Sequence, residues 1–210
     1  MNTFLDNQNW RYATKKFDAN KKVSAQDIEI LKEAIRLSTS SYGLQPYKVL
    51  IIENPELREA LKPAAWNQSQ ITEASHLIIF ANIINIGGGE IDSYVKTISE
   101  IRNIPFEDLT GYGAFMKSKI ATLPLEERNN WTSKQTYLAL ANLLNAAADL
   151  KIDVTPMEGF DREAVDEILG LKEKGLSVSL IATVGYRHED DTAQHLKKVR
   201  KSNEELFINL

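Results

Sequence analysis

Two short basic segments, far apart in the sequence, carry the side chains best suited to bind a ligand. Residues 11–22 contain five basic residues and one acid, and residues 197–201 contain four basic residues and no acid. The chain of 210 residues has a net charge of −4, so the rest of it is acidic. The two segments are either solvated surface, a nucleic-acid contact or two parts of one anion site. The acidic balance and the scarcity of basic residues interleaved with aromatic ones argue against nucleic acid.

The spacing of four of these basic residues suits a phosphate group. Arg11 and Lys15 are one turn apart if their segment is helical, and Lys198 and Arg200 share one side of an extended chain. A phosphate monoester is held best by two or three guanidinium or ammonium groups that converge from different segments. We therefore expect a small phosphate-bearing ligand, with solvated surface as the alternative. The other basic residues of the two segments are assigned to solvent: Lys16, Lys21, Lys22, Lys197 and Lys201.

Other kinds of chemistry find little support in the sequence. The chain has no cysteine, which excludes disulfide scaffolds, zinc–thiolate sites, iron–sulfur clusters and thiol catalysis. The three histidines, His76, His188 and His195, lack the spacing of metal ligands, and Ser40–Ser41 lacks the sharp-turn motif of a serine nucleophile. The longest apolar run is too short to span a membrane, and the first residues do not resemble a signal peptide. We expect a cytoplasmic protein with no metal and no membrane partner.

Alternating strands and helices are expected to position these residues around one sheet. The strands are predicted from runs of β-branched and apolar residues, at 47–52, 76–84 and 177–186, with an additional one within 205–210. The helices are predicted from apolar spacing and from capping and breaking residues, at 24–37, 55–62, 67–75, 90–120 in two parts that meet near 104–105, 132–150 and 161–170. Gly87–Gly89 indicates a flexible connector, and Thr155–Gly159 indicates a loop. This order is typical of an α+β or α/β sandwich.

Two of these helices carry a prediction about burial. Ile28, Leu31, Ile35 and Leu37 form one apolar stripe on the helix at 24–37. The helix at 132–150 has apolar residues on almost every face. A helix that is apolar all round is buried all round, so we expect it at the centre of the fold or in a subunit interface.

Six motifs, in order over residues 10–200, resemble the flavin-dependent nitroreductases. Arg11–Asp18 resembles their opening Arg-x-Ser-x-Lys-x-Phe motif, and Ser38–Tyr47 resembles their loop Ser-Pro-Ser-Ser-x-Asn-x-Gln-Pro-Trp. The other four motifs follow in the family's order: Asn67–His76, Pro156–Phe160, Gly170–Gly175 and Lys198–Arg200. The most similar subgroup is the oxygen-insensitive NAD(P)H nitroreductases, which includes dihydropteridine-reductase-like members.

The resemblance implies a fold and an activity. The fold would be α+β, a three-layer α/β/α sandwich in which residues 1–210 form one FMN-binding domain and two chains form an intertwined homodimer. The helix at 132–150 would lie along the dimer axis, and the C-terminal strand would extend over the partner. FMN would take a hydride at N5 from NAD(P)H and pass electrons to a nitroaromatic, quinone or related acceptor in a ping-pong cycle. The alternative is an FMN-binding or storage protein of the same fold with little turnover.

The resemblance also implies the residues that contact FMN. Arg11, Lys198 and Arg200 would hold its phosphate, and Lys15 would lie near flavin N1 and the C2 carbonyl. Asn67 would bond the pyrimidine edge, and the backbone N–H groups of Glu158–Gly159 would face N5 and O4. Pro156 and Met157 would pack on one flavin face, Gln135 would lie near the ribityl chain, and Ser40, Ser41 and Gly43 would come from the other subunit. The remaining cofactor contacts are Tyr12, Ala13 and Gln70. No side chain is expected to act as a catalytic acid or base.

Three residues depart from the family pattern. Ala13 replaces a serine that bonds the phosphate, Gly43 replaces an asparagine that reaches across the interface, and Gln70 replaces a lysine near the flavin. The loss of one hydrogen bond to a charged group weakens binding by about 1.5–3 kcal/mol unless Thr14 or water substitutes. Fewer cations beside the flavin would make it harder to reduce.

Overall fold

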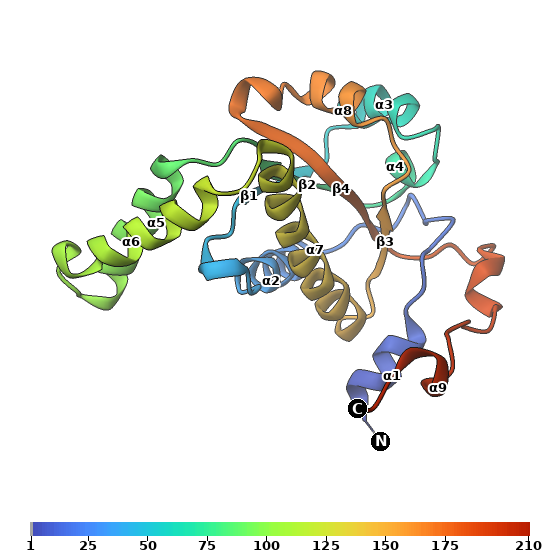
Figure 1. The fold of residues 1–210 in the computed structure, drawn as a ribbon. Coiled ribbons are helices and arrows are strands. Elements are labelled where there is room, and N and C mark those ends of the chain that lie inside the picture. Colours follow the sequence, from blue (N-terminus) through green and yellow to red (C-terminus); the bar gives the residue numbers. More distant parts are fainter. Residues whose placement is uncertain (1) are drawn as a thin grey trace.

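The central feature of the fold is an antiparallel sheet whose strands differ in length. A computed structural model describes residues 2–210, and these residues form a four-stranded sheet in the order β1-β2-β4-β3 (Figure 1). The strands are β1 (Tyr47–Ile52), β2 (His76–Ile83), β3 (Asp153–Met157) and β4 (Leu176–Gly185), and every neighbouring pair is antiparallel. The two central strands are buried on both faces, which explains why their sequences are almost continuously apolar.

The helices follow the predicted order closely. They are α1 (Thr3–Trp10), α2 (Ala25–Arg36), α3 (Pro55–Ala64), α4 (Gln70–Glu73), α5 (Gly88–Arg102), α6 (Phe106–Ala121), α7 (Leu125–Asp149), α8 (Arg162–Leu169) and α9 (Asn203–Leu206). Three short 3₁₀ turns are η1 (Ser41–Gly43), η2 (Lys172–Lys174) and η3 (Thr192–His195). The predicted N-caps Ser24 and Asp161 accept hydrogen bonds from the first turns of α2 and α8.

Helices cover both faces of the sheet. Leu31 of α2 and Leu143 of α7 pack with Phe80 in the core on one face. Leu61 of α3 and Val165 of α8 belong to the core on the other face. The predicted three-layer α/β/α arrangement of an α+β fold is therefore confirmed, and Figure 1 shows α7 and α2 on one side of the sheet with α3 and α8 on the other.

A helical hairpin, α5–α6, projects from one end of the sandwich (Figure 1). The two helices meet around Val95, Met116 and Ile120. The chain reverses at Asn103, which has a left-handed φ of 53°, just before the predicted break at residues 104–105. The prediction of a flexible connector at Gly87–Gly89 is wrong, because Gly88 already begins α5. The Glu90 carboxylate accepts a hydrogen bond of 3.0 Å from the Gly87 amide and caps that helix.

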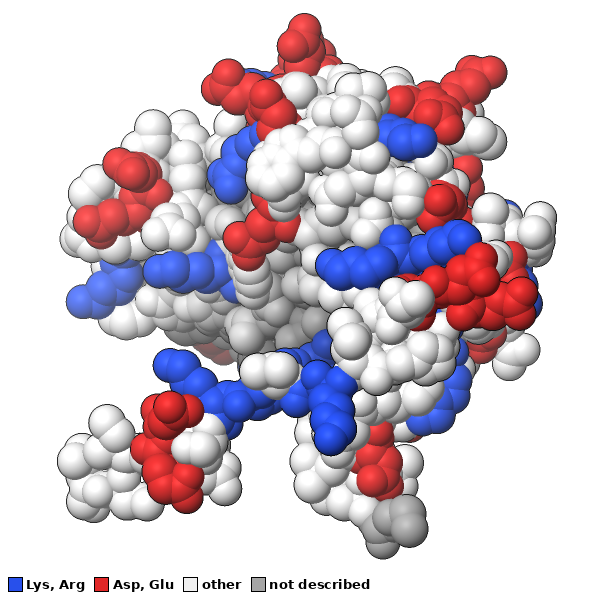
Figure 2. All heavy atoms as spheres, turned by 90° about the vertical axis from the view of Figure 1, so that its right-hand side faces the viewer, with Lys and Arg blue, Asp and Glu red and all other residues white. Residues whose placement is uncertain are grey.

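Two further predictions about elements are wrong. Residues 205–210 do not form a strand, since Ser202 caps α9 and the segment after Leu206 is irregular and exposed. In Figure 1, α9 lies beside α1 and away from the four strands, so the C-terminal segment pairs with none of them, and Figure 2 shows two lobes below the body of the molecule. Thr155–Met157 is not a loop, because these residues pair with β4 as part of β3.

The predictions about burial are confirmed only in part. Ile28, Leu31 and Ile35 of α2 are buried, but Leu37 ends the helix and is 64% exposed. Helix α7 begins at Leu125, earlier than predicted, and it is buried on one face only. On its other face Leu138 is 41% exposed. A single chain therefore leaves part of the apolar surface of α7 uncovered.

No helix within residues 2–210 is long and apolar enough to cross a membrane.

A buried arginine joins the helices on one face of the sheet. Arg58 of α3 donates hydrogen bonds to the carbonyl oxygens of Ile71, Ala74 and Ser75, where α4 ends and β2 begins. Ile71 lies in the last turn of α4, and Ala74 and Ser75 follow the helix, so none of these carbonyl groups can accept a hydrogen bond from within α4. Arg58 therefore fixes the entry of a central strand.

We expect Arg58→Met to destabilise the protein by roughly 3–5 kcal/mol, because three buried carbonyl groups lose their donor. Urea unfolding followed by circular dichroism measures this change. Arg102→Met is the matched control, since Arg102 is exposed on α5. Equal unfolding midpoints for the two variants would contradict the structural role of Arg58.

Candidate functional site

The two basic segments of the sequence meet at the end of α1. The Lys198 ammonium donates hydrogen bonds to the carbonyl oxygens of Gln8 and Arg11. The Arg11 guanidinium is held in turn by the Gln8 side chain at 2.9 Å. Arg200 lies close enough to influence the pKa of both Arg11 and Lys198. Segments almost 190 residues apart therefore place three cations together, as the phosphate hypothesis requires.

These cations have no acidic partner. Within residues 2–210, Arg11, Lys15, Lys198 and Arg200 take part in no ion pair. Partial burial, and then the charge of Arg200, lower the pKa of Arg11. Burial, and then the charges of Arg11 and Arg200, lower the pKa of Lys198. Figure 2 shows basic side chains gathered around a hollow between the body and the terminal lobes. An anion bound there would relieve the repulsion.

A buried carboxylate aligns the first basic segment. Asp191 accepts hydrogen bonds from the Tyr12 hydroxyl at 2.9 Å and from the Lys15 and Lys16 amides at 2.7 and 3.2 Å. Burial alone would raise the pKa of Asp191, but these donors together hold it below its ordinary value. The premise that Arg11 and Lys15 share a helix is wrong, because α1 ends at Trp10. Lys15 is positioned by Asp191 instead.

A stack of side chains fixes the first basic segment against the rest of the protein. The Arg187 guanidinium lies over the rings of Trp10 and Tyr12, at 4.3 and 4.5 Å from their centroids. Asp153 at the start of β3 accepts hydrogen bonds of 2.7 and 3.0 Å from the same guanidinium. Burial and then the hydrogen bond to Asp191 raise the pKa of Tyr12. The Tyr12 side chain is thus held by the scaffold.

No hydroxyl group near position 13 can replace the serine that the family pattern has there. Ala13 is exposed, so its backbone is open to a ligand but its methyl group can donate nothing. The Thr14 hydroxyl is fully buried and has no hydrogen-bond partner among the described residues. Thr14 therefore cannot replace the family's serine as a phosphate donor.

The turn after β3 is fixed from two sides. The Gly159 carbonyl accepts a hydrogen bond of 2.8 Å from the Gln68 side chain. A Cβ atom at Gly159 would lie 2.8 Å from the Trp66 ring, so a larger residue here would displace that exposed ring. Tyr137 of α7 donates a hydrogen bond of 2.8 Å to the Glu158 carboxylate. Before the turn, Pro156 is half-buried and Met157 is buried in β3.

The segment after α3 brings two more predicted residues to this end of the sheet. Trp66 and Asn67 both adopt left-handed backbone angles, and both are exposed beside the turn at Gly159. Gln70, in the first turn of α4, is buried. Asn67 is thus open to a ligand, whereas most of the Gln70 side chain is covered.

The other predicted residues form a separate group. Gln135 of α7 accepts a hydrogen bond of 2.8 Å from the Ser41 amide, and the Ser40 hydroxyl accepts one of 2.9 Å from the Gln45 amide. Gly43 lies in the same turn, η1. In Figure 1 this turn lies beside α2, on the opposite side of α7 from α1. Within one chain, the predicted site residues therefore form two separate groups.

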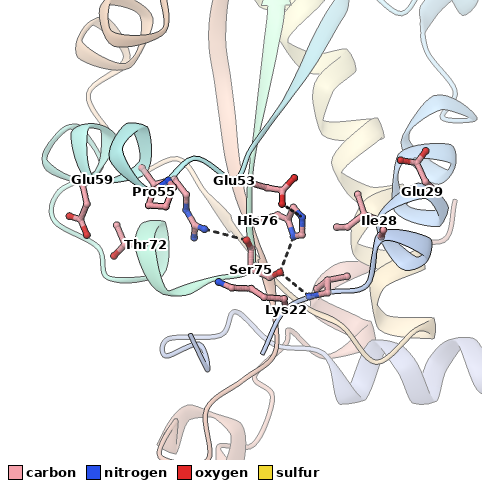
Figure 3. Close-up of a pocket in the computed structure, with 12 residues that line it drawn as sticks. Lys22, Ile28, Glu29, Glu53, Pro55, Glu59, Thr72, Ser75 and His76 are labelled. Atoms are coloured by element: carbon pink, nitrogen blue, oxygen red, sulfur yellow. Dashed lines mark hydrogen bonds and ion pairs between the residues drawn. The ribbon is translucent and has the colours of Figure 1, made fainter. Parts of the chain in front are cut away.

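A cavity of about 620 Å³ lies apart from both groups. Lys22, Glu53 and His76 line it, and none of the sequence-predicted cofactor contacts does (Figure 3). His76 is held by the Ser75 hydroxyl at 2.9 Å and faces the Glu53 carboxylate at 3.5 Å. Burial is the main cause of the lowered pKa of His76. Ser75 is itself buried and accepts the Val23 amide hydrogen, so this trio is structural.

Metal chemistry has no support in the part of the chain that the structure covers. Residues 2–210 contain no group of three or more His, Cys, Asp or Glu side chains able to hold an ion.

The structure is thus a three-layer α+β sandwich with a cluster of cations, free of ion pairs within residues 2–210, at one end of its sheet. The sequence profile of the Nitroreductase family matches residues 9–186. The chain belongs to this family.

Two relatives match most of the chain. YfkO of Bacillus subtilis, provisionally named an NAD(P)H nitroreductase, is 38% identical over 200 residues, covering 89% of each chain. The major NAD(P)H-flavin oxidoreductase of Aliivibrio fischeri is 35% identical over 209 residues, covering 95% of each chain.

Solved structures agree in fold. A nitroreductase-like protein of Streptococcus mutans has a TM-score of 0.86 at 20% identity, with 100% of this chain and 99% of that one aligned. A protein of Exiguobacterium sibiricum in complex with FMN has a TM-score of 0.84 at 19% identity, with 99% and 97% aligned.

We expect Glu158→Gln to lower the pKa of Tyr137. Burial, and then the hydrogen bond and charge of Glu158, raise the pKa of Tyr137 to about 12. The variant removes the charge, but the glutamine amide oxygen can still accept the hydrogen bond and the burial is unchanged, so the pKa should fall only part of the way toward the ordinary value of about 10. NMR of ¹³C-labelled tyrosine follows the titration, with Tyr137→Phe to assign the signal. Glu127→Gln, an exposed change at the other end of α7, is the control. An unchanged titration in Glu158→Gln would contradict the pairing.

Proposed function

We propose that this protein is an FMN-dependent NAD(P)H oxidoreductase that reduces nitroaromatic, quinone or related acceptors in a ping-pong cycle. The observation that carries the proposal is the cluster of Arg11, Lys198 and Arg200, which has the charge to bind a phosphate monoester and has no acid of its own. The name of the 35% identical Aliivibrio fischeri protein, an NAD(P)H-flavin oxidoreductase, supports the same chemistry.

FMN fits the residues on this side of the sheet. Arg11, Lys198 and Arg200 would hold the phosphate, with Tyr12 and Ala13 beside it. Lys15, free of any ion pair within residues 2–210, would lie near N1. Asn67 would face the pyrimidine edge of the flavin, and so would the small exposed part of Gln70. Pro156 and Met157 would support the ring, and the turn at Glu158–Gly159 would offer its amides to N5 and O4.

The division of the site residues into two groups supports a homodimer. Ser40, Ser41, Gly43 and Gln135 would complete the site of the other chain, so that each cofactor lies between two copies. The exposed apolar face of α7 supports the same arrangement, because Leu138 would be covered by a second chain. The exposed C-terminal segment, with Ile208 85% exposed, would pack against the partner. These observations support an intertwined homodimer.

When bound, FMN supplies the acceptor for the hydride of NAD(P)H at N5 and the reductant for the second substrate. The chain's own residues bind and orient. The cationic cluster anchors one end of the cofactor, and the turn at Gly159 is kept rigid by Gln68 and Trp66. Lys15 would stabilise negative charge at N1 on reduction. No side chain need act as an acid or base, because water supplies protons to the acceptor.

A second candidate is an FMN-binding or storage protein with little turnover. It is favoured by Ala13, by the buried Thr14 hydroxyl and by the covered Gln70, which together leave the cofactor with fewer polar contacts than the family pattern. Bound FMN without acceptor-dependent oxidation of NAD(P)H would identify it.

A single domain over residues 1–210 and a cytoplasmic location remain predictions.

The central test is anaerobic reduction. We expect the purified protein to be yellow and to bleach when NADPH or NADH is added without oxygen, because the hydride reduces the bound flavin. Addition of a quinone or a nitroaromatic should then restore the colour. A yellow protein that does not bleach would rule out the oxidoreductase and leave the storage protein. A colourless protein that takes up no added FMN would rule out both.

Arg200→Gln tests the phosphate site. Removal of one charged donor should weaken FMN binding roughly 10-fold to 150-fold, measured by fluorescence quenching on titration into apoprotein. Riboflavin, which lacks the phosphate, should bind the variant and the wild-type protein equally. The matched control is Lys201→Gln, one residue along, which should leave both affinities unchanged. Equal losses for FMN and riboflavin would place Arg200 elsewhere.

A further inference from the structure

The turn that carries Ser40 and Ser41 has an unusual backbone. Tyr42, Gly43 and Gln45 all have left-handed φ values, of 59°, 77° and 45°. Tyrosine and glutamine rarely adopt this conformation, since their Cβ atoms crowd the backbone. Such a turn persists only when surrounding contacts fix it. The anchors of this turn therefore determine where Ser40 and Ser41 lie.

Three side chains supply these anchors. Gln135 of α7 accepts the Ser41 amide hydrogen at 2.8 Å, and the Trp131 ring packs edge-on against Tyr42 with centroids 6.3 Å apart. The third anchor comes from the projecting hairpin. The Tyr94 hydroxyl of α5 donates a hydrogen bond of 2.6 Å to the Tyr42 carbonyl oxygen.

Tyr94 also explains the glycine at position 43. A Cβ atom on Gly43 would lie 2.5 Å from the Tyr94 hydroxyl oxygen, far inside van der Waals contact. Asparagine tolerates left-handed φ better than most residues, so the backbone alone does not exclude the asparagine of the family motif. An asparagine side chain would instead have to displace the Tyr94 hydroxyl, which would break its hydrogen bond to the Tyr42 carbonyl oxygen. Gly43 and Tyr94 thus form one unit, in which the ring occupies the space that a side chain at 43 would need.

We propose that Tyr94 is a positioning residue for the cofactor site: it replaces the missing side chain at position 43 and fixes the turn that presents Ser40 and Ser41 to the partner's flavin. The inference rests on the proposed FMN-binding dimer. It connects α5 to the cofactor site, so that the placement of the α5–α6 hairpin sets the geometry of the turn. Gly43 is then a matched replacement for asparagine, and it costs the site no rigidity.

A double-mutant cycle tests the pairing. Gly43→Asn in the wild-type background should lower the melting temperature of the apoprotein and weaken FMN binding more than tenfold, because the new side chain meets Tyr94. Tyr94→Ala alone should also weaken both. In the double variant Gly43→Asn/Tyr94→Ala, the asparagine should cost less than about threefold relative to Tyr94→Ala, since its space is then free.

Tyr94→Phe isolates the hydroxyl and should weaken FMN binding about twofold to tenfold. Tyr112→Phe is the matched control, because the Tyr112 hydroxyl has no hydrogen-bond partner among the described residues, and it should change nothing. Equal costs of Gly43→Asn with and without Tyr94 would overturn the pairing. Coupling in melting temperature with no coupling in FMN affinity would overturn the positioning role. A wild-type protein that binds no FMN would refute the proposed function itself, while the apoprotein cycle would still report the pairing.

Discussion

Arg11, Lys198 and Arg200 repel one another, and the fold nevertheless holds them together. Their positions depend on the two ends of the chain. Lys198 donates hydrogen bonds to the carbonyl groups at the end of α1. The side chain of Asn7, in the same helix, donates a hydrogen bond to Asp149 at the end of α7. Because no carboxylate within residues 2–210 pairs with these cations, an anion bound at the proposed site would offset their repulsion. Folding and binding would then be linked, because the anion would stabilise the arrangement that binds it.

Within one copy, the sheet separates the two groups of residues that the proposed site needs. The cationic cluster and the turn at Gly159 lie near β3, one edge of the sheet, whereas Ser40 and Ser41 precede β1, the opposite edge. Helix α7 runs between them and is buried against the sheet on one face only. The uncovered face carries apolar residues, among them Tyr137, Leu138 and Ala141. A second copy that covered them would also bring the β1 side of one chain to the β3 side of the other. The same contact would bury the helix and assemble the cofactor site.

Local patterns predicted most of the fold. The apolar runs of β2 and β4, the N-caps at Ser24 and Asp161, and the break before Pro105 each depend on neighbouring residues, so the sequence alone carried enough information. Predictions failed where a distant contact decides the conformation. The segment Thr155–Met157 contains a proline, which favours a loop. It nevertheless pairs with β4 and forms part of an edge strand. The apolar C-terminus resembled a strand, but it lies away from both edges of the sheet and pairs with neither.

The candidate site divides in the same way. Its cations could be recognised from charge and motif, because a phosphate site needs particular residue types. Asp191, Tyr137 and Tyr94 could not, since each acts through a contact with a residue far away in the sequence, and neither a buried aspartate nor a tyrosine in a helix has a distinctive local pattern. Gly43 shows the consequence. Taken alone, it is a lost polar contact; with Tyr94 hydrogen-bonded across the turn, it is the only residue whose side chain leaves room for that contact. Ala13 has no such partner, because the neighbouring Thr14 hydroxyl is buried. Of the departures at Ala13 and Gly43, the second would be compensated by the proposed Tyr94 contact, whereas the first leaves the phosphate without a donor, so of these two positions Ala13 is the one that should weaken cofactor binding.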